Sequence, residues 1–330
     1  MLRSIAKSAL RPLWRPLRHR LEHIVRSQVA PVESVVLEQG SRLDVLLDRL
    51  NAAVLARHGK RAVDPVQLYP FPHTEDECQP DTILHGFCPV CGQPASFSPF
   101  TSNLRESGPC SCCSSFNRQR QMARAVRLRF GVPDQGPLTV PAGTVIYNTE
   151  TTGAVHAALR ATPGYLSSEY FDPALAPGTM VDGRRHEDLQ HLSFDDESID
   201  LVLSSDVLEH MPAPYDAHCE IFRVLRPGGS HIFTVPFIPD QPRDDVRAEL
   251  IDGEIAYRAP QLFHGDPVRP DEGVLVWTIF GMEMLLKLRE LGFEVCARNL
   301  HAPEMGILGD MPIVFEATKP ERSTRSERPS

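Results

Sequence analysis

The sequence lacks any run of about 20 apolar residues, so it predicts no membrane-spanning helix. It also lacks a secretory signal, because Arg11, Arg15 and Arg18 interrupt the apolar N-terminus and no small-residue cleavage site follows. A basic excess is missing too: 34 Lys and Arg stand against 43 Asp and Glu, a formal net charge of -9, which argues against general nucleic-acid binding. These absences favour a cytoplasmic protein.

The N-terminal region departs from the acidic average, with seven Lys and Arg against one acid in residues 1–30. Apolar residues recur at helical spacing over 35–54, so residues 1–59 predict a basic, amphipathic helical arm. Two interpretations stay open. The arm packs on its own domain or on a second copy of the chain, or it rests peripherally on the anionic inner membrane surface.

Six of the eight cysteines crowd between Cys78 and Cys113, which without an export signal indicates metal ligation before disulfides. Two C-x-x-C knuckles predict a four-cysteine ribbon with structural zinc, iron being the weaker option. Cys112 is then spare or replaces Cys113. The predicted ligands are Cys88, Cys91, Cys110 and Cys113. The ribbon and a basic helix over 117–130 form a module spanning 85–130, after a linker at 60–84 rich in Pro, Asp and Glu.

From residue 143 to 319, β-like and helix-like segments alternate, which predicts a parallel sheet with helical crossovers. The fold class is therefore α/β, with a doubly wound, mostly parallel, seven-stranded sheet. The expected strands are 144–148, 165–170, 199–204, 230–235, 293–298 and 313–318, and the expected helices are 154–160, 213–225 and 281–291. The Arg- and Ser-rich tail, 320–330, is expected to be disordered.

Residues 192–235, "LSFDDESIDLVLSSDVLEHMPAPYDAHCEIFRVLRPGGSHIFTV", carry several motifs at matching spacing. They resemble the class I S-adenosylmethionine-dependent methyltransferases of the type 11 branch, which pair a "VLEH" strand end with a downstream "RVLKPGG". The resemblance implies a Rossmann-like fold that binds S-adenosylmethionine beyond the carboxyl ends of its strands. The ribbon resembles those on some bacterial methyltransferases with roles near glycan or natural-product biosynthesis.

The resemblance also implies cofactor contacts. Glu169 would bond the ribose hydroxyls, Asp188 would lie near the adenine amine, and Ser205 and Asp206 would face the methionine part. The glycine-rich turn departs from the family pattern, because 149–153 reads Thr-Glu-Thr-Thr-Gly. Thr149, Glu150 and Gly153 remain the expected contacts there, with Glu150 replacing the acid that the family places where Tyr147 stands. The branch either binds the cofactor with this variant loop or is a non-catalytic relative. In an alternative interpretation, Asp206 or Glu209 caps the following helix.

The segment 236–277 is expected to cover the acceptor as a shaped loop. His264 is a candidate base, or a structural histidine. His210 is expected to stabilise its loop or touch the cofactor, and a role as a second candidate base stays open. The predicted reaction is methyl transfer to an oxygen or nitrogen of a small-molecule or glycan acceptor. Two rivals remain: a silent methyltransferase-like scaffold, and a nucleic-acid-binding or nucleic-acid-modifying protein built on the ribbon and the Arg118–Arg129 helix.

Overall fold

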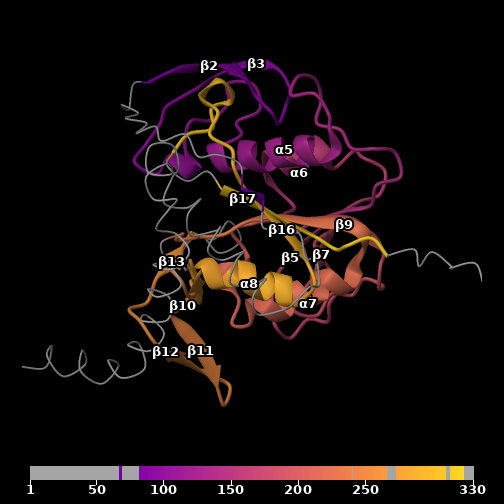
Figure 1. Cartoon of the computed structure of the whole chain (residues 1–330), viewed down its shortest axis with the longest axis vertical. Helices are drawn as coiled ribbons and strands as arrows, with labels where there is room; N and C mark the ends of the chain where they lie inside the picture. Colours follow the sequence, from indigo (N-terminus) through magenta and orange to yellow (C-terminus); the bar gives the residue numbers. More distant parts are fainter. Residues whose placement is uncertain (1–66, 69–81, 240, 266–272, 310–312, 323–330) are drawn as a thin grey trace, which may run out of the picture. The chain divides into compact units, whose positions relative to one another are not determined.

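The computed structural model describes residues 67–68, 82–239, 241–265, 273–309 and 313–322. The predicted arm, 1–59, and the tail beyond 322 lie outside these residues. The described residues are centred on a nine-stranded sheet of order β1-β16-β17-β9-β8-β4-β5-β7-β6 (Figure 1). The sheet strands are β1 (Gln67–Leu68), β4 (Ile146–Asn148), β5 (Tyr165–Glu169), β6 (Met180–Val181), β7 (Arg184–His186), β8 (Ile199–Ser205), β9 (Leu225–Thr234), β16 (Glu294–Asn299) and β17 (Ile313–Thr318).

The prediction of a doubly wound, mostly parallel sheet is confirmed. Strands β7, β5, β4, β8 and β9 run parallel, and β17 is antiparallel to both of its neighbours. The sheet has nine strands instead of the predicted seven: the six that the sequence places, together with β7 and two short edge strands, β1 and β6. Strand β1 corrects the expectation of a plain linker at 60–84, since Gln67 and Leu68 pair with Cys296 and Ala297 of β16.

Helices cover both faces of the sheet, as Figure 1 shows. On one face lie α5 (Asn117–Phe130) and α6 (Gly153–Leu159), and on the other lie α7 (Pro214–Val224) and α8 (Met282–Glu290). Met122 and Val126 of α5 belong to the same hydrophobic core as Ile146, Leu203 and Ile232 of the sheet. The basic helix that the sequence assigns to the ribbon module is therefore also a sheet-covering helix.

The ribbon is a hairpin of β2 (Leu84–Phe87) and β3 (Pro94–Phe97), followed by a 3-10 turn, η1 (Leu104–Glu106). A second 3-10 turn, η3 (Pro303–Met305), packs against β2. Cys88 and Phe97 of the ribbon are buried in the core that α5 and the sheet share. The ribbon thus packs on the sheet through α5 and η3.

The Pro227-Gly228-Gly229 stretch lies inside β9 instead of before it. Leu225 already pairs with Ile199 of β8, and pairing resumes at Ser230 opposite Leu201, so the four residues between form a bulge. Gly228 has a φ of 79°, a left-handed conformation that suits glycine. The strand expected at 230–235 therefore begins five residues earlier.

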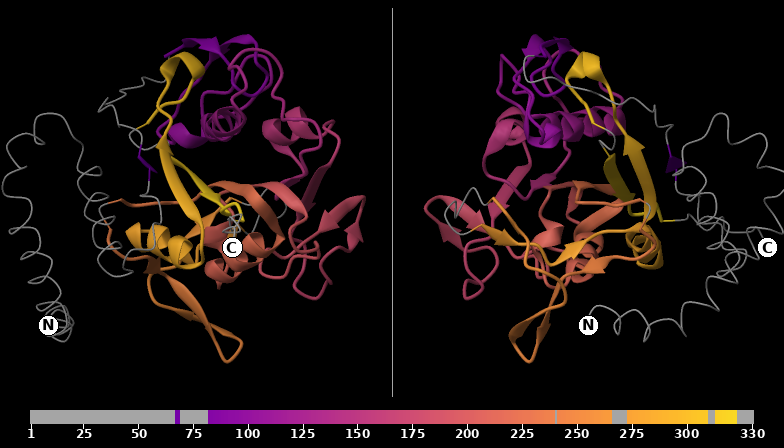
Figure 2. Two further views of the ribbon diagram at one scale, coloured as in Figure 1. Left: turned by 45° about the vertical axis from the view of Figure 1, so that its right-hand side comes forward. Right: turned by 90° about the vertical axis from the view of Figure 1, so that its left-hand side faces the viewer.

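The segment expected as a shaped loop instead forms small antiparallel pairs. These are β10 (Asp245–Val246) with β15 (Thr278–Ile279), β11 (Ala248–Ile251) with β12 (Glu254–Tyr257), and β13 (Phe263–His264) with β14 (Val274–Leu275). The β11–β12 hairpin extends away from the sheet in both views of Figure 2. Among the described residues no helix combines the length and apolarity that crossing a membrane requires.

Candidate functional site

The candidate site lies at the carboxyl edge of the parallel strands. There β4 lies between β5 and β8. The strands that follow β4 in the chain are added to the sheet first on the β5 side and then on the β8 side, so the direction of winding reverses at β4. In doubly wound sheets such a switch point opens a crevice where ligands bind. Every predicted cofactor residue follows or ends one of these strands: Thr149, Glu150 and Gly153 after β4, Glu169 in β5, Asp188 after β7, and Ser205 and Asp206 at β8.

The turn after β4 leads into α6 at Gly153, whose φ is 84°. A Cβ added at Gly153 would lie 2.8 Å from Nε2 of Gln119, so α5 closes over this turn. Thr149 donates its backbone N–H to the Leu203 carbonyl at 3.0 Å. Its Oγ1 is buried and has no hydrogen-bond partner among the described residues. An unsatisfied buried hydroxyl is costly, which fits a turn that takes a polar ligand.

Glu169 ends β5 and Asp188 follows the neighbouring strand β7, and hydrogen bonds hold each carboxylate in place. Oε1 of Glu169 accepts hydrogen bonds from the backbone N–H and the Oγ1 of Thr151, at 3.0 and 2.7 Å. Oδ1 of Asp188 accepts from the backbone N–H of Gln190 at 2.9 Å. Glu169 therefore connects the β5 end to the variant turn, an arrangement that the sequence did not predict.

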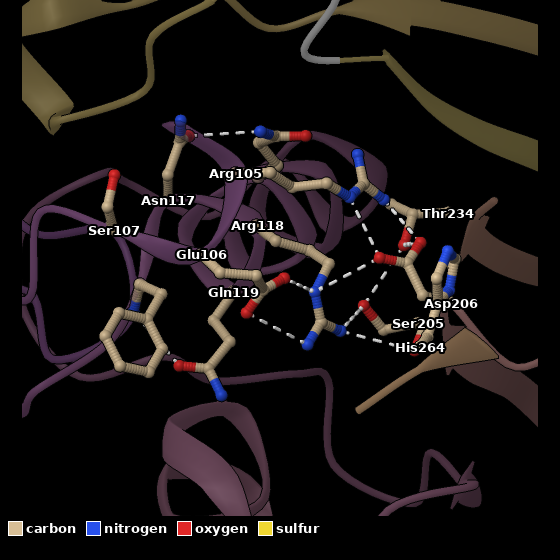
Figure 3. Close-up of polar contacts among 12 residues, drawn as sticks. Arg105, Glu106, Ser107, Asn117, Arg118, Gln119, Ser205, Asp206, Thr234 and His264 are labelled. Atoms are coloured by element: carbon tan, nitrogen blue, oxygen red, sulfur yellow. Dashed lines mark hydrogen bonds and ion pairs between the residues drawn. The ribbon is translucent and has the colours of Figure 1, made fainter. Parts of the chain in front are cut away.

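Asp206 adopts a φ of 54°, accepts hydrogen bonds from two side chains and forms an ion pair with a third (Figure 3). Arg105 of η1 donates from Nε at 2.8 Å, Thr234 donates from Oγ1 at 3.0 Å, and Nε of Arg118 lies 3.3 Å away. Burial alone would raise the pKa of this carboxyl. The two arginines outweigh burial and hold its pKa below the usual value.

Arg118 crosses from α5 to the end of β8. Its guanidinium donates to the Ser205 carbonyl at 3.2 Å and lies 2.5 Å from Glu106 and 3.5 Å from Glu150. Burial works against its positive charge, but the carboxylate of Asp206, followed by those of Glu106 and Glu150, raises its pKa. Burial in turn raises the pKa of Glu150, against the effect of Arg118. Arg118 thus connects Glu150 to Asp206 on this side of the crevice, although the sequence does not predict it as a site residue.

Beyond β8, the 3-10 turn η2 (Leu208–His210) brings together three groups that the sequence treats separately. Oε1 of Glu209 lies 3.7 Å from Nε2 of His210 and 3.7 Å from Nδ1 of His264. Burial raises the pKa of Glu209, and the Glu209 carboxylate raises that of His264. The helix-cap alternative for Asp206 and Glu209 is wrong, because α7 begins after Ala213 with no side-chain cap.

The methyltransferase-domain family matches residues 166–233, which run from β5 to β9. Uncharacterized methyltransferases of Mycobacterium marinum and Mycobacterium avium are similar to this chain, at 32% identity over 114 residues and 34% over 128. The matches cover 34% and 38% of this chain and 45% and 51% of the relatives, so the chain spans about half the length of these relatives. Residues 166–233 thus match a methyltransferase domain, and the relatives that the chain resembles over part of its length are methyltransferases.

One solved structure similar to this methyltransferase domain is an S-adenosylmethionine-dependent methyltransferase from Mesorhizobium loti. It has a TM-score of 0.36 at 17% sequence identity, and the match covers 60% of this chain and 97% of that one.

Arg105, Arg118 and Gln119 lie at the candidate site but are absent from the residues that the sequence predicts there. The sequence predicts a basic helix here, but its Arg120 and Arg127 are buried. Their guanidinium groups donate to backbone carbonyls, Arg120 to Gly306 at 2.8 Å and Arg127 to Pro89 at 2.7 Å. These two arginines of the helix are consequently not available to bind a nucleic acid. The apolar residues Met122, Ala123 and Val126, spaced as on one helix face, were the signal that α5 is packed inside.

The four predicted zinc ligands converge, with their sulfurs all within 4.8 Å of one another. Sγ of Cys88 lies 3.7 Å from Sγ of Cys113. Sulfurs bound tetrahedrally to zinc at about 2.3 Å lie about 3.8 Å apart, so the cluster fits a zinc ion. Cys112 is exposed and outside the cluster, which decides the alternative between Cys112 and Cys113 in favour of Cys113.

Proposed function

We propose that this domain binds S-adenosylmethionine at the carboxyl edge of the sheet and transfers its methyl group to an oxygen or nitrogen of a small-molecule or glycan acceptor. The observation that carries the proposal is the convergence of the predicted contact residues at the switch point of the sheet. Glu169 would hold the ribose hydroxyls and Asp188 the adenine amine. The Thr149–Gly153 turn, Ser205 and Asp206 would line the methionine part.

The residues present suit the charged groups of the cofactor. Arg105 and Arg118 offer guanidinium groups to a carboxylate, and Glu150 and Asp206 offer acceptors to an ammonium group. The unpartnered Oγ1 of Thr149 offers a further hydrogen bond. Arg118 now forms bonds that join the two sides of the crevice. A bound ligand would replace some of these bonds with bonds to its own charged groups.

Bound S-adenosylmethionine supplies an electrophilic methyl group, and its sulfur leaves with the electron pair of the broken C–S bond. The chain aligns the acceptor with that methyl group and excludes water, which lowers the barrier by positioning. The acceptor proton leaves as the new bond forms. His264, with 38% of its side chain exposed, is the candidate base; His210, bonded through Nδ1 to the Leu275 carbonyl, is the candidate for holding the loop.

Titration calorimetry with S-adenosylmethionine tests the proposal. We expect saturable binding by the wild type and, in Glu169→Ala, a loss of about 1–3 kcal/mol through the missing charge-assisted hydrogen bonds. Glu249→Ala removes an exposed carboxylate paired with Arg258 and should bind like the wild type. Absence of wild-type binding at millimolar cofactor would favour the silent scaffold. That second candidate is motivated by Arg118, which bridges Glu150 and Ser205 across the crevice.

We further propose that Cys88, Cys91, Cys110 and Cys113 hold a structural zinc ion. Four thiolates leave no open coordination position, so the ion would stabilise the ribbon and take no part in the transfer. The protein would act in the cytoplasm. Self-association through residues 1–59, or their contact with the inner membrane surface, stays a prediction outside the described residues.

A further inference from the structure

We propose that Glu209, His210 and His264 form a binding site for a divalent metal ion, separate from the four-cysteine cluster. One ligand atom from each of the three residues lies within 4.8 Å of the other two. The Glu209 side chain is fully buried, and neither carboxylate oxygen has a hydrogen-bond partner among the described residues. A buried carboxylate without hydrogen bonds is strongly disfavoured unless a cation accompanies it.

The orientation of His210 points to the same conclusion. Its Nδ1 lies 2.9 Å from the Leu275 carbonyl oxygen, which accepts and cannot donate, so Nδ1 carries the proton. In the neutral ring Nε2 then directs a lone pair toward Oε1 of Glu209, 3.7 Å away. Two electron-rich atoms face each other there, at a distance too long for a hydrogen bond. Metal-binding histidines commonly donate their other N–H to a backbone carbonyl in this way.

The donor set also restricts the ion. Two imidazoles and one carboxylate suit manganese, iron or zinc better than magnesium, and three protein ligands leave positions open. Donor atoms around an ion at about 2.1 Å lie about 3.0–3.5 Å apart. The two distances of 3.7 Å to Glu209 would need to shorten only slightly.

Exposure shows from which side such an ion would be reached. The exposed fraction of the side chain rises from 0% for Glu209 through 15% for His210 to 38% for His264. The open positions of the ion would therefore face the side of His264, a residue that Figure 3 shows beside Asp206. Asp206 belongs to the proposed methionine end of the cofactor site, so an acceptor on the ion would lie next to the transferred methyl group.

This placement makes an oxygen acceptor, such as a hydroxyl group, the favoured substrate class, a step that rests on the proposed methyl transfer. A divalent ion lowers the pKa of a bound hydroxyl, so its proton passes to solvent water. The oxygen then forms the new C–O bond while the C–S bond breaks and sulfur keeps its electron pair. In this arrangement His264 acts as a metal ligand instead of a base.

Manganese binding, followed by the loss of the free Mn²⁺ electron paramagnetic resonance signal, tests the site in the full chain. The hard Mn²⁺ ion should leave a zinc-loaded thiolate cluster in place. We expect one Mn²⁺ per chain for the wild type, and affinity at least about tenfold weaker in Glu209→Gln and in His264→Asn. Glu249→Gln and His85→Asn make the same chemical changes at exposed residues outside the cluster and should bind like the wild type.

His264 is partly exposed, so His264→Asn is the decisive variant if Glu209→Gln does not fold. If the wild type binds neither Mn²⁺ nor a second Zn²⁺, or if the folded variants bind as the wild type does, the metal site is overturned and a proton accompanies Glu209 instead. Calorimetry with S-adenosylmethionine on metal-depleted protein separates the two proposals. Cofactor binding without Mn²⁺ binding removes only the metal site, whereas Mn²⁺ binding without cofactor binding removes the methyl transfer and leaves the site.

Discussion

His218 of α7 is a buried imidazole surrounded by aromatic rings. It lies against Phe233 and His231, with ring centroids 5.2 and 5.5 Å away. Neither of its nitrogens has a hydrogen-bond partner among the described residues. Burial lowers its pKa to about 3. Because this is below the unfolded value of about 6.5, the unfolded chain takes up the proton first, and stability is lost as pH falls below that value.

We expect His218→Phe to flatten the acid side of the stability profile. The wild type should lose up to about 1.4 kcal/mol of unfolding free energy per pH unit through this one group as pH falls below about 6. Phenylalanine keeps a ring in the site and has no proton to gain. Denaturant unfolding at pH 5 and pH 8 measures the difference. Equal pH dependence in the two proteins would show that His218 is not held neutral.

At the scale of single residues, the sequence predicts that every proposed cofactor contact lies at the carboxyl edge of the sheet. It does not predict which neighbouring side chains hydrogen-bond to these residues. Glu169 could be predicted because it ends a strand, and strand ends meet at one edge of a parallel sheet. Its bond to Thr151 and the reach of Arg118 to Ser205 depend on side-chain rotamers and on packing of distant segments. No local pattern in the sequence encodes those.

Among the elements, the ribbon offers a test in which neighbouring cysteines are compared. Cys113→Ser should lower bound zinc and the unfolding temperature, because a hydroxyl is a poor substitute for a thiolate ligand. Cys112→Ser makes the same change at an exposed residue and should change neither. Elemental analysis and thermal unfolding measure both effects. Equal zinc content in the two variants would contradict the predicted ligand set.

Elements with a clear period were predicted to within a few residues, whereas the shortest were missed. Helix α5 (Asn117–Phe130) has the predicted limits, and α7 (Pro214–Val224) lies one residue inside them at each end. Two-residue strands such as β1 and β13 show no alternation at all. They exist because partners far along the chain are brought beside them, as Cys296 is brought beside Gln67.

Over the whole molecule, the ribbon, α5 and the sheet share one core, and a pair of substitutions on α5 tests this. Met122 is 2% exposed and packs in that core, while Leu128 on the same helix is 42% exposed. We expect Met122→Ala to cost about 2–5 kcal/mol of unfolding free energy and Leu128→Ala much less. Denaturant unfolding of the full chain measures both. A small cost at Met122 would mean that α5 is only loosely attached to the sheet.

The core shared by α5 and the sheet has a consequence for anyone dividing this chain. The stretch recognisable as a methyltransferase starts at Leu166, after the central strand β4 and after α5. A fragment cut there would leave Leu201 and Leu203 of β8 without β4 and the helix above it. The part of the chain that matches other proteins in sequence is therefore smaller than the part that folds together, and a graft of this unit would need to begin upstream of Cys88.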